Sequence, residues 1–227
     1  MKAKRIVIKI GTNVLHRSNG KLDYKLITEL AGQITNIRGG GHEVLVVSSG
    51  SVGAGRELFS VDESNNTLAS HQILASVGQA RLIQIYADAF REHKITVAQI
   101  LLTRGDFGLR KSYLNIRNTL ENLLKYKIVP IVNENDVVAT EELDLNFGDN
   151  DLLAVYLATL IGADQLFFLT VAPGLLKEET TAEGKRSVVV EKVHELTDEI
   201  LKHCLPVTSA GGKGGMESKV RSAGMAM

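Results

Sequence analysis

The stretch IVIKIGT, residues 6–12, indicates the fold of this chain, because its β-branched residues form an apolar run that carries one lysine and ends in glycine and threonine. A strand that is apolar on both faces is typical of a parallel sheet covered by helices on both sides. Apolar residues then recur at helical spacing until three glycines at 39–41, and a second apolar run follows at 44–47. This alternation of strand and helix predicts an α/β fold.

The same alternation continues along the chain. After a glycine-rich turn that follows the second strand, we expect helices over 68–92, 112–126 and 151–162, and strands over 95–102, 128–133 and 165–170. Right-handed crossovers make these elements an αβα sandwich with a mainly parallel central sheet. Residues 134–148 and 171–195 interrupt the pattern, and a short hairpin is expected at 187–193. A last helix begins near Gly215, and since doubly wound sheets usually continue from such a helix to another strand, we expect the domain to extend beyond Met227.

The composition excludes several classes of protein. The 227 residues suit a single α/β domain over 1–227. Lys+Arg and Asp+Glu both number 26, so the basic excess typical of proteins that bind nucleic acids or anionic membranes is missing. One cysteine, Cys204, allows no intrachain disulfide, and no apolar stretch has the length of a leader or a membrane span. We therefore expect a cytoplasmic protein with neither nucleic acid nor membrane as its partner.

Polar or glycine residues directly follow four of the expected strands. They are Lys9–Thr12, Ser48–Ser51, Asn133–Asp136 and Thr170. Because open parallel sheets bind ligands beyond the carboxyl ends of their strands, four such ends predict one site. A lysine at the end of an apolar strand either extends to the rim or faces an anion, and with Gly11 behind it we favour the anion for Lys9.

The segment AGGKGGMESK, residues 210–219, is a second basic element. Backbone N–H groups at a glycine-rich helix entry bind phosphate, and Lys219 lies one turn into the expected helix. A flexible glycine loop with a surface lysine, Lys213, is the competing interpretation. The Walker A loop does not fit because Gly214 follows Lys213, and the dinucleotide fingerprint fails because Glu217 stands where its last glycine is needed.

Acids and amides gather at both ends of residues 133–151, as Asn133–Asp136 and Gly148–Asp151. Neither cluster holds His or Cys and the EF-hand spacing fails, so we predict no protein-built metal site. Three interpretations remain, namely recognition of an amino group, Mg²⁺ that arrives with a nucleotide, or orientation of the lysines. The acids between the two ends are expected to be solvated charge.

Together these residues resemble the amino acid kinase family over nearly the whole chain. The matching stretches are VIKIGTNVL (7–15), VVSSGSVGAGR (46–56), LASVGQARLIQIY (74–86), QILLTRGDF (99–107), NIRNTL (115–120), PIVNENDVVAT (130–140), FGDND (147–151) and GGKGGMESK (211–219). Asn-Glu-Asn-Asp followed by Gly-Asp-Asn-Asp is typical of the members that phosphorylate glutamate. The resemblance implies ATP-dependent phosphorylation of the γ-carboxylate of L-glutamate, the first step of proline biosynthesis, with Mg²⁺ carried by ATP. It also implies a homo-oligomer (dimer or tetramer), feedback inhibition by proline, and in many members an additional C-terminal PUA domain, which the 227 residues do not include.

The resemblance also implies roles for single residues. Lys9 and Lys219 would neutralise the transferring phosphoryl group, while Asp149 and Asp151 would orient these lysines and the bound substrates. Four residues would bind glutamate, namely Ser49, Gly50, Asp136 and Asn150. The nucleotide would contact Lys9, Gly11, Thr170, Val171, Lys213, Gly214, Gly215, Met216, Glu217, Ser218 and Lys219.

The chain departs from the family pattern at two of these positions. Val171 stands where an aspartate is usual, and Lys213 stands where threonine is common. Two other interpretations stay open. One is a related kinase for N-acetylglutamate or a carbamate-like substrate, although acetylation would leave Asp136 without a cationic partner. The other is a non-catalytic amino-acid sensor, although a sensor does not need the two phosphoryl-transfer lysines.

Overall fold

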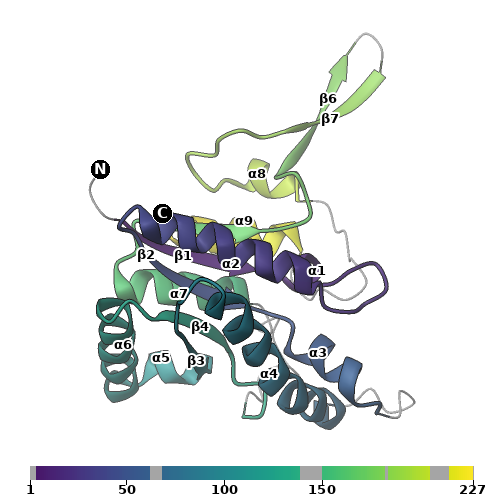
Figure 1. Ribbon diagram of the computed structural model, residues 1–227. Coiled ribbons are helices and arrows are strands. Elements are labelled where there is room, and N and C mark those ends of the chain that lie inside the picture. The colour runs from purple at the N-terminus through teal and green to yellow at the C-terminus, as the bar shows by residue number, and fades with distance from the viewer. Residues whose placement is uncertain (1–3, 62–67, 139–149, 182–183, 205–214, 227) are drawn as a thin grey trace.

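The computed structural model describes residues 4–61, 68–138, 150–181, 184–204 and 215–226. In this part of the chain, five strands form one sheet in the order β3-β4-β2-β1-β5, and every neighbouring pair is parallel (Figure 1). The strands are β1 (Arg5–Ile10), β2 (Glu43–Ser48), β3 (Val97–Leu102), β4 (Val129–Glu134) and β5 (Gln165–Leu169). The predicted parallel α/β sheet is therefore confirmed.

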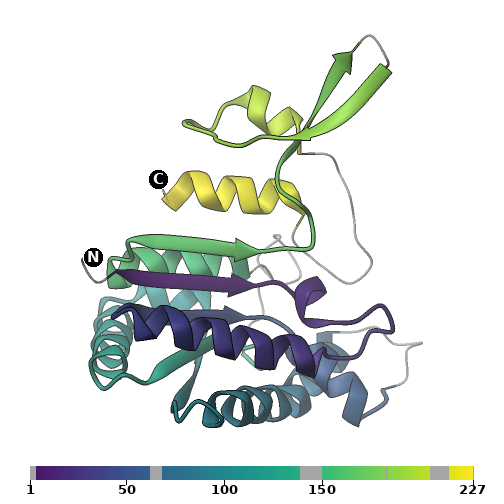
Figure 2. The same ribbon diagram turned by 45° about the horizontal axis from the view of Figure 1, so that its top comes forward.

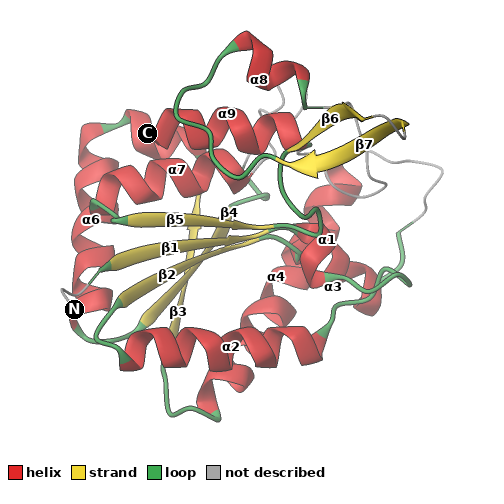
Figure 3. Ribbon diagram, turned by 90° about the horizontal axis from the view of Figure 1, so that it is seen from above, coloured by secondary structure: helices red, strands yellow, loops and turns green. Residues whose placement is uncertain are grey.

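Helices cover both faces of this sheet, which Figure 3 shows almost edge-on. One face carries α2 (Tyr24–Gly39) and α4 (Leu68–Arg91), and the other carries α6 (Arg110–Lys125) and α7 (Asn150–Ile161), with α9 (Met216–Ala226) beside α7. Shorter helices are α1 (Thr12–Leu15), α3 (Ser51–Leu58), α5 (Arg104–Gly108) and α8 (Asp198–Lys202). The αβα sandwich follows from strands whose side chains are apolar on both faces, because each face needs its own layer of helices.

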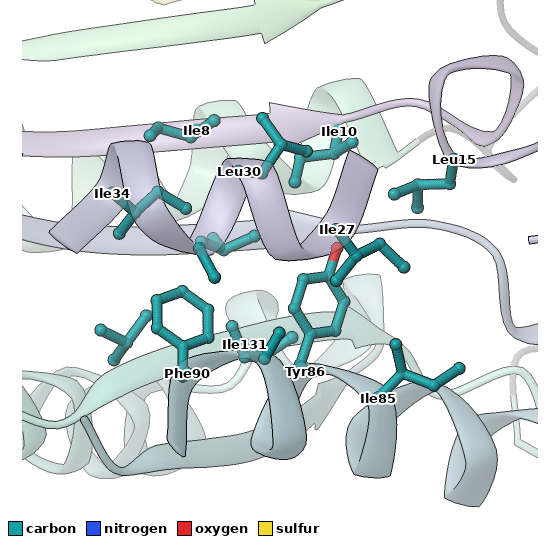
Figure 4. Close-up of a cluster of buried hydrophobic side chains, with 14 of the residues drawn as sticks. Ile8, Ile10, Leu15, Ile27, Leu30, Ile34, Ile85, Tyr86, Phe90 and Ile131 are labelled. Atoms are coloured by element: carbon teal, nitrogen blue, oxygen red, sulfur yellow. The ribbon is translucent and has the colours of Figure 1, made fainter. Parts of the chain in front are cut away.

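Each face of the sheet has its own apolar core. On the α2/α4 face, Ile8 and Ile10 of β1 pack with Ile34 of α2 and with Tyr86 and Phe90 of α4, as Figure 4 shows. On the other face, side chains of β1, β2 and β4 pack against α6 and α7. Burial of a side chain of this size contributes about 1.5–3 kcal/mol, so these two cores hold the strand ends in place.

The segment after β2 differs from the expected turn, because residues 51–58 form α3. This helix lies against α4 at a distance that only glycine permits. A Cβ atom on Gly55 would stand 2.0 Å from the carbonyl oxygen of Leu74, and one on Gly78 would stand 1.7 Å from that of Ser51. Gly55, which belonged to the expected turn, and Gly78, which lies inside the expected helix, are thus packing positions between two helices.

The expected hairpin is also displaced. Its strands are β6 (Leu176–Thr181) and β7 (Gly184–Val189), so only residues 187–189 of the predicted 187–193 belong to it. The strands are polar, and cross-strand ion pairs join Glu178 to Lys185 at 3.2 Å and Glu179 to Arg186 at 3.4 Å. An apolar pattern does not indicate strands of this kind. Figure 2 shows the hairpin at the top of the molecule, apart from the main sheet. Within the described ranges, no helix is long and apolar enough to cross a membrane.

Candidate active site

The strand ends that the sequence singled out meet at one edge of the sheet. β1 and β5 lie side by side and run in the same direction (Figure 2), with Ile10 in register with Leu169. On the other side of β1, Ile10 is in register with Ser48 at the end of β2. Lys9, Ser48 and Thr170 are thereby brought together in space although they are far apart in the chain. A parallel sheet has this effect because all carboxyl ends lie on one edge.

The most strongly charged part of this edge consists of Lys9, Asp151 and Lys219. The Nζ atom of Lys9 lies 2.5 Å from Oδ1 of Asp151, and Nζ of Lys219 lies 3.0 Å from Oδ2. The side chains of Asp151, Lys9 and Lys219 are 0%, 5% and 15% exposed. One carboxylate thus holds two ammonium groups in a nearly water-free position, and the three side chains together carry one net positive charge.

The electrostatics keep Asp151 ionised. Burial alone raises the pKa of its carboxyl group, but the charges and hydrogen bonds of Lys9, followed by those of Lys219, outweigh burial and hold the pKa below its ordinary value. Asp151 also lies in the first turn of α7, where the helix dipole favours a negative charge.

Asn150, the residue before Asp151, belongs to a second cluster. Its Nδ2 atom donates towards the carbonyl oxygen of Ser48 at 3.0 Å, Oγ of Ser49 at 3.0 Å and Oδ1 of Asn133 at 2.9 Å. Asn133 in turn donates from Nδ2 to Oε1 of Gln79 on α4 at 2.8 Å. This chain of amides connects the helix layers on the two faces across the ends of β2 and β4.

Two members of the amide chain had no predicted role: Asn133 lay within a predicted strand end of the site, and Gln79 was not among the predicted site residues. Asn133 is 3% exposed and directly follows the apolar residues of β4, so a polar residue at a buried strand end was the available signal. Gln79 had no such signal, because a single glutamine on a long helix usually lies on the solvent face.

Asp136 and Gly50 lie next to this second cluster. Oγ of Ser51 donates to Oδ2 of Asp136 at 3.0 Å, which connects the segment after β4 to the start of α3. Gly50 precedes α3 with φ 106°, a left-handed conformation that glycine adopts without strain. The predicted substrate residues Ser49, Gly50, Asp136 and Asn150 are therefore connected through hydrogen bonds or directly adjacent in the chain.

The residues predicted to contact a nucleotide lie around the lysine cluster. A Cβ atom on Gly11 would stand 3.7 Å from Nζ of Lys9, so this glycine leaves the space beside the ammonium group open. Thr170 and Val171 follow β5 and are exposed. Gly215, Met216, Glu217 and Ser218 lead into the turn of α9 that carries Lys219. Asp149, Lys213 and Gly214 lie outside the described residues.

Comparison with known proteins places the chain in a family. The model described as "Amino acid kinase family" matches residues 4–227. The chain belongs to the amino acid kinase family. The predicted fold and family are thereby confirmed.

Several curated relatives carry the name glutamate 5-kinase. The protein of Caldanaerobacter subterraneus subsp. tengcongensis is 42% identical over 219 residues, which cover 96% of this chain and 58% of the relative. That of Chlorobaculum tepidum is 43% identical over 95% of this chain and 58% of its own length, and that of Aliivibrio fischeri is 41% identical over 99% and 60%. The chain thus spans 58–60% of the length of these relatives.

A solved structure supports the fold independently of the sequence. Carbamate kinase from Giardia lamblia, bound to AMP-PNP, superposes with a TM-score of 0.62 over 97% of this chain and 87% of that one, at 18% sequence identity. At that identity the likeness shows a shared amino acid kinase fold and nothing about the substrate.

Proposed function

We propose that this chain transfers the γ-phosphoryl group of ATP to the γ-carboxylate of L-glutamate, which forms L-glutamyl 5-phosphate and ADP in the first step of proline biosynthesis. The observation that supports this proposal is the pairing of Lys9 and Lys219 on one buried carboxylate beside a cluster of amides and Asp136. The relatives named glutamate 5-kinase, more than 40% identical to the chain, favour glutamate over other acceptors.

The lysine cluster has the charge that a phosphoryl donor needs. Lys9 and Lys219 share the carboxylate of Asp151, so these three described side chains carry a net positive charge that favours a bound anion. Both oxygens of Asp151 face ammonium groups, so Mg²⁺ would be held by the phosphates of ATP, where it neutralises their charge. We further propose that Gly11, Thr170, Val171 and the segment from Lys213 to Lys219 contact the nucleotide.

The second cluster suits the amino-acid end of glutamate. The carboxylate of Asp136 would bind the substrate ammonium group, with Asn150 and Ser49 completing the contacts and the backbone of Gly50 meeting the α-carboxylate. Asp136 is fixed by the hydroxyl of Ser51 at 3.0 Å, so its position is set before a substrate arrives. Asp149 would act with Asp151 in orienting the lysines.

The chemistry needs no strong general base. An oxygen of the γ-carboxylate attacks the γ-phosphorus, the bond from that phosphorus to the bridging oxygen of ADP breaks, and no proton has to move because the carboxylate is already ionised. Catalysis then consists of bringing two anions together and stabilising the charge on the migrating phosphoryl group. Lys9 and Lys219 would do both, because each places a positive charge at the position where glutamate and ATP repel one another.

Trapping the acyl phosphate tests this function directly. Protein, MgATP and hydroxylamine are incubated with L-glutamate, N-acetyl-L-glutamate or carbamate, and hydroxamate is measured for the two amino-acid substrates and ADP for all three. We expect hydroxamate from L-glutamate alone. Product from N-acetyl-L-glutamate would point to a related kinase, and ATP binding without turnover on any acceptor would refute the enzymatic proposal.

Three further expectations rest on the family resemblance. The chain would assemble as a dimer or tetramer, be inhibited by proline, and work in the cytoplasm, where ATP and glutamate are available. Sedimentation, inhibition of hydroxamate formation by proline, and cell fractionation measure these three properties.

A further inference from the structure

In the amide chain from Asn150 to Gln79, the carbonyl oxygen of Ser48 determines which atom of each amide is the nitrogen and which is the oxygen. The carbonyl oxygen of Ser48 accepts hydrogen bonds and cannot donate, so the Asn150 atom 3.0 Å away has to be Nδ2. Asn133 then has to present Oδ1 to this same Nδ2, which leaves its own Nδ2 facing α4. Oε1 of Gln79, at 2.8 Å, is the acceptor that meets it.

The opposite end of Asn150 is an unused acceptor. Its Oδ1 atom is buried, and it has no hydrogen-bond partner in the described part of the chain. Nδ2 is held by three oxygens at 2.9–3.0 Å, so the amide cannot turn around to exchange the two atoms. A buried acceptor without a partner costs about 1–3 kcal/mol, and a ligand N–H group that reaches it recovers this cost.

We propose that Gln79 is a positioning residue that, through Asn133, holds Asn150 with Oδ1 as an acceptor and thereby gives the site its preference for a substrate bearing an ammonium group. This inference rests on the proposed function and adds a residue that need not touch the substrate. Gln79 acts because it is the only side chain in the amide chain that comes from α4, and its Oε1 accepts a hydrogen bond from Nδ2 of Asn133 at 2.8 Å. Without that acceptor, the buried Asn133 amide gains by leaving its position.

A series of substitutions at residue 79 separates hydrogen-bond character from shape. Glu, Met and Lys are unbranched like Gln and have similar helix propensities, so they alter α4 little. Q79E keeps an acceptor towards Asn133, Q79M offers almost none, and Q79K presents donors only. The ligands are L-glutamate and glutarate, which is glutamate without its amino group, and titration calorimetry measures both affinities.

We expect the preference for glutamate over glutarate to follow this series. Q79E should keep the wild-type glutamate affinity within about threefold, while Q79M weakens it about tenfold and Q79K weakens it further, as expected for loss of one hydrogen bond to a charged group. Glutarate affinity should change less than about twofold in all three, because glutarate has no ammonium group for Oδ1 to bind. In turnover assays Q79M should raise KM for glutamate and leave KM for ATP unchanged.

Two results would overturn the inference. One is equal weakening of glutamate and glutarate in Q79M, which would make Gln79 a merely structural residue. The other is equal loss of glutamate preference in Q79E and Q79M, and this pair decides the question even where Q79K does not fold. If the wild type binds glutamate but forms no hydroxamate, the proposed function fails, while the affinities of the three variants still test the role of Gln79. If the wild type binds neither ligand, both proposals fail.

Discussion

Replacing Asp151 by asparagine removes one negative charge without changing the shape of the side chain. The carboxylate is 0% exposed, and its two oxygens lie 2.5 Å and 3.0 Å from the ammonium groups of Lys9 and Lys219. In D151N, the amide offers an oxygen to one lysine and an N–H donor to the other. The ammonium groups of Lys9 and Lys219 then lose the carboxylate that they share.

The size of the effect follows from these distances. Coulomb's law with an effective dielectric constant of about 20 gives about 6 kcal/mol for each pair of unit charges 2.5–3.0 Å apart. The measured loss will be smaller, since the buried carboxylate no longer has to be kept out of water. Breaking a buried ion pair from one side costs about 3–5 kcal/mol, and we expect D151N to lower the free energy of unfolding by this amount.

Urea unfolding of the wild type and D151N at pH 7 gives this difference. The matched control is D88N, which breaks the exposed pair of Asp88 with Arg91 at 2.9 Å and should cost no more than about 1 kcal/mol. ATP should raise the melting temperature of D151N more than that of the wild type, because its phosphates replace the lost negative charge, although turnover falls. Equal losses in D151N and D88N would refute the reasoning.

The pH dependence of the same difference gives a second check. The pKa of Asp151 in the folded protein lies below its ordinary value of 3.8, so its ionised form stabilises the fold fully above that pH. The stabilisation is lost only as the pH falls through the lower, folded-state pKa. The difference between wild type and D151N should therefore stay constant from pH 8 to pH 5. A difference that shrinks within this range would mean that ionisation of Asp151 is not its source.

Three further substitutions test other parts of the site. Lys219→Ala should reduce turnover about 10²–10³-fold, by analogy with removal of an oxyanion donor, with much less effect on the Kd of glutamate. Equal losses of turnover and of glutamate affinity would contradict a role for Lys219 in phosphoryl transfer. Gly78→Ala places a Cβ atom 1.7 Å from the carbonyl oxygen of Ser51, so it should lower thermal stability by at least about 1–3 kcal/mol and weaken glutamate binding. Gly108→Ala, with nothing within 4 Å, is its control and should do neither. Tyr86→Phe removes a buried hydroxyl and should cost about 0.5–1.5 kcal/mol in urea unfolding. Burial raises the pKa of Tyr86 from 10.0 to about 12, so the free energy of unfolding of the wild type should fall as the pH rises between these values. In Tyr86→Phe this fall should be absent.

The main sheet could be predicted from the sequence because its signal is local. Strands apolar on both faces occur only where helices cover both sides, and the expected helix at 68–92 matches α4 at 68–91. The predictions failed where the deciding interaction is not local. Gly55 allows α3 to touch α4, yet in a single sequence the glycines after β2 look like a turn. The hairpin of β6 and β7 is polar and carries exposed cross-strand ion pairs, which no apolar pattern indicates.

The candidate site, too, could be predicted from the sequence only in part. Lys9 could be named in advance, because a charged residue at the end of an apolar strand is conspicuous, whereas the role of Asp151 came from the family resemblance. The resemblance implied that Asp151 orients the two lysines, and the structure adds that its two oxygens each face one ammonium group, because residues 9, 151 and 219 meet only after the sheet has formed. Gln79 could not be predicted either. Its role depends on the orientation of the Asn133 amide at the end of β4, which donates to Gln79 only in the folded structure.

The start of α7 explains how two clusters of opposite character can lie side by side. Asn150 and Asp151 are consecutive, but successive residues of a helix point in directions about 100° apart, so neighbours do not share a face. One side chain therefore joins the neutral amides and the other joins the lysines. Their Cα atoms are only about 3.8 Å apart, as in any trans peptide. In the proposed function, a substrate held at the amide cluster would lie within reach of the positive charges. A reaction that depends on positioning two anions needs that proximity more than it needs an acid or a base. An extra residue inserted directly after Asp151, within the first turn of α7, would rotate Asn150 and Asp151 by about 100° relative to the rest of the helix, so it should abolish substrate binding and phosphoryl transfer together.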